Sequence, residues 1–120
     1  MNIEEYRSYC LSKKKVTESF PFPKLPNILV FKVLGKMFTA TDINNFKSIS
    51  VKANPDDIEK LRFRFSCLDI QPYMSKKHWN KVILDHSVSD NVIYKWIDTS
   101  YELVIKNFTK KQQQELTMNS

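Results

Sequence analysis

The amino-acid sequence predicts a single α/β domain of the α+β kind, a mostly antiparallel sheet with its helices packed on one face. Three observations support this prediction. The chain of 120 residues fits one compact domain and is too short for two. Residues 28–53 alternate apolar and polar side chains with the period of two that strands require. Residues 89–108 instead repeat apolar side chains with the period of an α-helix.

The first predicted element is a helix that follows Asn2 and runs to about Lys14. Asn2 can cap this helix, and Glu5 three residues later completes a capping box. The lysines at 13–15 lie at the helix C-terminus, where positive charge complements the helix dipole. Residues 20–26 hold three prolines, which fix φ and remove backbone donors, so we expect an extended connector there.

The next two strands are predicted to form a hairpin around Gly35, the only glycine in the chain. A type II′ turn with Gly35 at its first central position gives this residue a positive φ. Such a turn sets Val33 opposite Phe38 and Phe31 opposite Ala40. Residues 48–53 continue the alternation and predict a third strand.

A second helix is predicted to begin at Asn54, a good N-cap residue, with Pro55 at its first position. Residues 66–77 lack any period and contain a proline, which indicates a long loop with room for a short strand. Residues 78–84 alternate again and predict a further strand.

The last helix is predicted to begin after Ser89 and to carry an apolar stripe as far as Phe108. The polar residues at about 110–120 are expected to form a frayed tail of the single domain, which spans 1–120. We expect Phe31 and Trp79 to be core residues, with His78 only a structural neighbour.

The composition favours a cytoplasmic protein with an acidic partner. Nineteen Lys and Arg residues exceed thirteen Asp and Glu residues, which gives a net charge of +6 and favours polyanions. The longest apolar run, Ile28 to Phe31, is far shorter than the roughly 20 residues of a membrane span. The N-terminal residues show no targeting pattern. We therefore expect no membrane contact.

Common enzyme motifs are missing from the sequence, because one glycine cannot supply a G-x-S-x-G elbow, a P-loop or a dinucleotide-binding loop. Cys10 and Cys67 stand alone and predict reduced, buried thiols. Two alternatives remain open: a metal site formed by His78, His86 and Asp85, and a thiol–imidazole pair of Cys67 with His78. We expect no enzyme activity, catalytic residue, metal, cofactor or small-molecule substrate.

The segment from Tyr73 to Lys81 combines three lysines and a histidine with two aromatic side chains and holds no acid. Basic side chains beside aromatic rings suit the phosphates and bases of nucleic acid, although a tryptophan that begins a strand is commonly a core residue. The hairpin tip and the outer sheet face could extend this surface. The sequence thus predicts weak, salt-sensitive contact with duplex DNA through Lys32, Lys36, Lys52, Lys76, Lys77 and Lys81. The alternative is a non-enzymatic interaction module that binds an acidic protein.

Several elements along the chain resemble the MmcQ/YjbR family of small bacterial proteins. In order, these elements are Phe20-Pro21-Phe22, Phe31–Phe38, Ser50–Lys52, Tyr73–Asn80 and Ile97–Tyr101. The most specific are Gly35-Lys36-Met37-Phe38 and Lys76-Lys77-His78-Trp79-Asn80.

The resemblance implies a CyaY-like α/β fold with a double-wing arrangement, and a DNA-binding role that rests on likeness of shape. The sequence departs from the family pattern at Lys15 and Pro23, where glycine is frequent, which affects the geometry of the connector. Frataxin-like folds also suggest metal handling by acidic ridges. The first helix, however, offers only Glu4 and Glu5 for this purpose.

Overall fold

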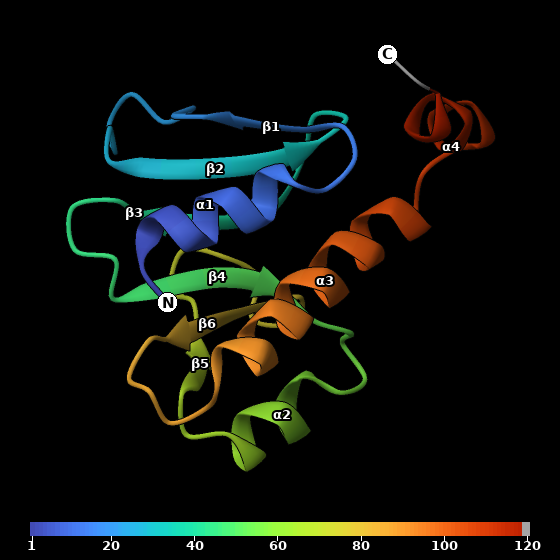
Figure 1. The fold of residues 1–120 in the computed structure, drawn as a ribbon. Coiled ribbons are helices and arrows are strands. Elements are labelled where there is room, and N and C mark those ends of the chain that lie inside the picture. The colour runs from blue at the N-terminus through green and yellow to red at the C-terminus, as the bar shows by residue number, and fades with distance from the viewer. Residues whose placement is uncertain (119–120) are drawn as a thin grey trace.

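Six antiparallel strands form one sheet in the order β1-β2-β3-β4-β6-β5 (Figure 1). The computed structural model describes residues 1–118. The strands have the following bounds: β1 Val16–Ser19, β2 Ile28–Val33, β3 Lys36–Asp42, β4 Ser48–Lys52, β5 Leu68–Ile70 and β6 Trp79–Ile83. The predicted antiparallel sheet is therefore confirmed, including a short strand within the long loop.

Four helices accompany the sheet: α1 Ile3–Leu11, α2 Ile58–Arg64, α3 Asp90–Lys106 and α4 Lys110–Thr117. Figure 1 shows α1 and α3 lying across the same face of the sheet. The predicted α+β fold is thus confirmed, and the opposite face carries no helix among the described residues. None of the helices within residues 1–118 is long and apolar enough to span a membrane.

The main core lies between this sheet face and the helices. Tyr6 of α1 is fully buried and packs edge-on against Phe31, with ring centroids 5.4 Å apart. The Tyr6 hydroxyl lies 2.9 Å from Thr39 Oγ1, which in turn donates to the Ser50 carbonyl. Ser100 of α3 donates to the Phe38 carbonyl. Every buried side-chain nitrogen and oxygen within residues 1–118 has a hydrogen-bond partner, as a low-dielectric core requires.

The two aromatic residues expected in the core are both buried, but on different sides of the sheet. Phe31 belongs to the main core and is fully buried, as predicted. Trp79 is 9% exposed and alternates along β6 with Asn80, whose side chain contacts α2. Trp79 therefore lies on the open face, where Lys52 Nζ is 5.6 Å from its ring centroid.

The hairpin keeps the predicted positive φ at Gly35 but not the predicted register. Leu34 (φ 46°) and Gly35 (φ 80°) are the two central residues, the pattern of a type I′ turn, so Val33 pairs with Lys36. A bulge then leaves Phe38 without a partner, and Phe31 pairs with Thr39 instead of Ala40. The extra residue turns both Phe38 and Thr39 toward the helices, which is how the bulge favours core packing.

Two elements were not predicted. The edge strand β1 pairs with β2, although its four residues are too short for a clear alternation. The frayed tail expected at 110–120 is wrong for residues 110–117, which form α4 with a capping box of Thr109 and Gln112 and with Leu116 buried. Residues 119–120 lie outside the described part of the chain.

Two helix boundaries also differ from the prediction. Helix α1 has the predicted capping box but ends at Leu11 rather than near Lys14. Helix α2 begins at Ile58, because Asn54 forms a local turn in which its side chain accepts from the Asp56 amide at 2.9 Å.

Lys15, just after α1, has a φ of 60°, in the left-handed region. A residue with a Cβ atom costs about 1–2 kcal/mol in this conformation, whereas glycine adopts it freely. We therefore predict that Lys15→Gly raises the free energy of unfolding by about 0.5–1 kcal/mol, after the added flexibility of the unfolded chain is subtracted. Urea denaturation measures the change. Lys14→Gly is the control and should lower stability, because Lys14 has no positive φ to relieve; equal effects of the two variants would contradict the prediction.

Candidate functional site

The open face of the sheet has a row of small side chains at its centre. Ala40 of β3 pairs with Ser50 of β4, and Ser50 pairs with Lys81 of β6. These residues alternate with Thr39 and Asn80, whose side chains contact the helices, so the row points away from them. Because alanine and serine fill little space, the centre of this face is hollow.

Loops raise two walls around this hollow and turn it into a groove of about 680 Å³. The proline-rich connector supplies Phe22 and Leu25, and the loop at 71–78 supplies Tyr73 and Met74. Their exposed fractions of 41% for Phe22 and 54% for Leu25 are high for large apolar side chains. Exposed apolar side chains gathered around a hollow are typical of a binding surface.

Two side chains hold the 71–78 loop in place. Gln71 Nε2 donates to Ser50 Oγ at 2.8 Å, which ties the start of the loop to the groove floor. Arg62 of α2 donates to the carbonyls of Lys76 and Trp79 and to Asn80 Oδ1, at 2.5, 2.9 and 2.7 Å. These hydrogen bonds anchor the loop near both of its ends.

The structure distributes the six lysines predicted to bind nucleic acid over more than one surface. Lys81 lines the groove, and alternation places Lys32 and Lys52 on the same open face. Lys76 and Lys77 are exposed in the loop before β6. Lys36 instead pairs with the core residue Val33 and so extends from the other side of the sheet. Strand β4 separates the hairpin from β6, so the two are not neighbours. Whether these lysines contact nucleic acid stays a prediction.

The charges in the groove are available to a ligand. Within residues 1–118, the three ion pairs use the Met1 amine, Arg7 and Lys13 as their cations. Lys81 makes no ion pair there, although Asp69 lies directly opposite it on β5. Lys47 also lines the groove, beside one carboxylate, Asp42. Lys47 was not among the predicted lysines, because its position on the groove depends on how the β3–β4 turn folds.

The alternatives that involve cysteine and histidine have no geometric support in the structure. Cys67 is fully buried in the core, whereas His78 is exposed. The described residues contain no group of three potential metal ligands among His, Cys, Asp and Glu. Both cysteines are free and buried, as predicted, and burial raises the pKa of the Cys10 thiol, which disfavours its thiolate.

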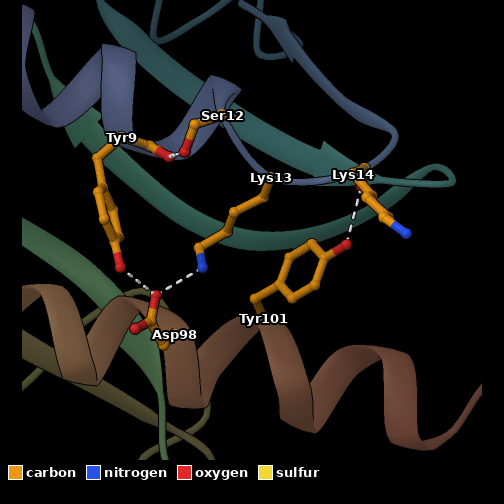
Figure 2. A network of polar contacts seen from close by, with 6 residues as sticks. All are labelled: Tyr9, Ser12, Lys13, Lys14, Asp98 and Tyr101. Atoms are coloured by element: carbon orange, nitrogen blue, oxygen red, sulfur yellow. Dashed lines mark hydrogen bonds and ion pairs between the residues drawn. The ribbon is translucent and has the colours of Figure 1, made fainter.

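A second polar cluster joins the C-terminus of α1 to α3 (Figure 2). Lys13 Nζ lies 2.5 Å from Asp98 Oδ1, and the Tyr9 hydroxyl donates to the same oxygen at 2.6 Å. Figure 2 shows the Lys13 side chain extended between Tyr9 and Tyr101, whose ring centroids are 5.0 and 5.1 Å from its nitrogen. Tyr101 also donates to the Lys14 carbonyl at 2.9 Å.

This cluster connects two helices rather than lining the groove. Lys13 was predicted to complement the dipole of α1, but its closest charged partner is Asp98, 85 residues away. Burial raises the pKa of Tyr9 to about 12, and the hydrogen bond to Asp98 adds to the increase because the carboxylate favours a protonated phenol. Because its polar groups already pair with one another, we interpret the cluster as a structural link.

The contacts in this cluster predict how the pKa of Tyr9 depends on Asp98. Asp98→Asn removes the negative charge, so the pKa of Tyr9 should fall from about 12 toward its ordinary value of 10.0 but not reach it, since burial remains. NMR titration of the Tyr9 ring, assigned with Tyr9→Phe, measures the change. In the unmodified protein the free energy of unfolding should decrease between pH 10 and 12, because only unfolded Tyr9 ionises there. An unchanged pKa in Asp98→Asn would contradict the proposed link.

Comparisons with known proteins reach the same family as the sequence motifs. The YjbR family model matches residues 11–103. The protein YjbR of Escherichia coli K12 is 32% identical over 119 residues, which cover 97% of each chain. The protein YbdF of Escherichia coli O157:H7 is 25% identical and covers 86% of this chain and 89% of its own. These names state no ligand or activity.

Solved structures share the fold. Deinococcus radiodurans protein DR2400, described by its DUF419 domain, superposes with a TM-score of 0.88 and 34% identity, covering 98% of this chain and 89% of its own. A Pseudomonas syringae protein with 24% identity has a TM-score of 0.72 over 86% of this chain and 98% of its own, which shows likeness of fold alone. The family match, the identities and the shared motifs agree, and the chain belongs to the YjbR family.

Proposed function

We propose that this protein is a non-enzymatic binding module that takes an acidic partner protein on the open face of its sheet. The observation that carries the proposal is the groove of about 680 Å³, with an apolar lining and two lysines without ion pairs among the described residues. An interface of this kind gains affinity from buried apolar surface, and its charges select the partner.

The lining of the groove supports binding rather than catalysis. Its ionisable side chains are Asp42, Lys47, Tyr73 and Lys81, with no histidine or cysteine among the described lining residues. Ser50 Oγ accepts a hydrogen bond from Gln71 and Thr41 Oγ1 donates to the Ser48 carbonyl, so neither hydroxyl is hydrogen-bonded to a base that would activate it for acyl transfer. The Asp42 carboxylate already accepts a hydrogen bond from the Asn44 amide at 2.8 Å, which fits a role in the turn.

Nucleic acid is the second candidate partner, and one observation favours it. Lys76 and Lys77 are exposed in the same loop as Tyr73, which is 93% exposed and offers a free aromatic ring. Phosphate contacts and base stacking need such a combination. The groove itself favours a protein, since Phe22 and Tyr73 are its only aromatic lining residues in the described chain and most of its apolar side chains are aliphatic or methionine.

A charge-reversal experiment tests the proposed function. The probe is a fluorescein-labelled peptide of about twelve glutamates, followed by anisotropy at low salt. We expect Lys47→Glu/Lys81→Glu to weaken binding by about tenfold, because two attractive contacts become repulsive. The matched control is Lys60→Glu/Lys95→Glu, which changes the net charge equally at exposed positions of α2 and α3. Equal losses in both pairs, or no binding to the unmodified protein, would reject the open face as the site.

The second candidate has its own test. If the protein binds duplex DNA through its lysines, each phosphate contact contributes roughly 0.9 to the slope of log affinity against log salt concentration. Replacing Lys76, Lys77 and Lys81 with alanine should then reduce the magnitude of this slope by about 2 to 3. Absence of DNA binding at low salt, or an unchanged slope in the triple variant, would exclude this candidate.

A further inference from the structure

We infer that the groove binds an acidic segment of the partner protein through that segment's aliphatic side chains, which enter the groove while its carboxylates meet Lys47 and Lys81. This inference rests on the proposed function and adds the chemistry of the ligand. The inference is based on the burial of the groove floor, the apolar side chains of the lining and the charges of its lysines.

The floor of the groove is nearly buried, whereas its walls are exposed. Ala40 and Ser50 expose only 5% and 6% of their surfaces, whereas Leu25 and Tyr73 on the walls expose 54% and 93%. A site with a nearly buried floor and exposed walls suits individual side chains that project from a backbone.

Most apolar side chains that line this space are aliphatic or methionine, and Phe22 and Tyr73 are the aromatic ones among the described lining residues. Ile28 and Met37 lie on the β2–β3 side, and Met74 and Ile83 lie on the side of β6 and its preceding loop. Methionine has three rotatable bonds and a polarizable sulfur, so it adapts to apolar side chains of varied shape. The lining therefore favours leucine-like side chains over a single rigid ligand.

The charges at the groove set the sign of the partner. Lys81 lies opposite Ser50 at the floor of the groove. Lys47 also lines the groove and immediately precedes β4. Asp42 is the only carboxylate among the described lining residues, and Asp69 lies opposite Lys81 on β5. Lys32 and Lys52 lie on the same open face, so cations outnumber these carboxylates. A segment that carries Asp or Glu beside its aliphatic residues is complementary to this lining.

The test compares two labelled peptides of about twelve residues, a length whose extended chain matches the 39 Å longest dimension of the protein. One peptide is all glutamate, and the other replaces three alternate glutamates with leucine. We expect the leucine peptide to bind at least about tenfold more tightly despite its lower charge, because its side chains enter the groove. Ala40→Phe, which fills the floor, should abolish this advantage, so that the leucine peptide no longer binds more tightly than the all-glutamate peptide.

A second variant and a nucleic acid control make the outcomes decisive. Ser48→Phe narrows the groove at a half-buried position and replaces Ala40→Phe if that variant does not fold. Equal affinity for both peptides, or a leucine advantage that survives groove filling, would overturn the inference while the proposed function stands. No binding of either peptide would reject both. Tighter binding of a DNA oligonucleotide, lost when Lys76, Lys77 and Lys81 are replaced with alanine, would overturn the inference in favour of nucleic acid.

Discussion

The packing of α1 and α3 against one face of the sheet is the interaction on which the rest of the structure depends. Strands alternate their side chains, so covering one face commits every second residue to the core and leaves the others on the open face. The bulge at Phe38 reinforces this division, because two consecutive residues of β3 turn toward the helices. Ala40 then resumes the alternation and begins the floor of the groove.

The same packing explains the cluster at the end of α1. Lys13 and Asp98 are distant in sequence, and they meet only because both helices cross the same face. The two tyrosine rings beside Lys13 reduce its contact with water and favour its ion pair. The Lys13–Asp98 ion pair joins α1 to α3. Tyr6 and Ser100 instead join these helices to the sheet, through hydrogen bonds to the Thr39 side chain and the Phe38 carbonyl.

Much of the fold could be predicted from local patterns. The capping box of Asn2 and Glu5, the alternation of the central strands and the apolar stripe of α3 each express a local preference that the structure keeps. The hairpin shows the limit of such patterns. Gly35 adopts the predicted positive φ, but Leu34 adopts one as well. The register of the hairpin therefore depends on the bulge and on the packing of Phe38, and not on the glycine alone.

The candidate site was harder to predict, for a physical reason. A lysine is visible in a sequence, but the space above Ala40 and Ser50 exists only because two loops distant in the chain form walls around it. Phe22 and Met74 carry no pattern that marks them as neighbours of one groove. The charge pattern therefore predicts Lys81, whereas Lys47 and the apolar lining depend on tertiary structure and could not be predicted in this way.

Neither the family fold nor the net charge identifies the binding partner of this protein. A net charge of +6 attracts any polyanion over distances of about a Debye length, so it raises the rate of encounter with nucleic acids and acidic proteins alike. Selection between them requires short-range contacts that one partner makes and the other cannot. Under the proposed function, the nearly buried floor and the apolar walls of the groove would supply such contacts to a protein segment. The lysines on the open face would then increase the rate of encounter with acidic partners, and the space between the walls would determine which partner stays bound.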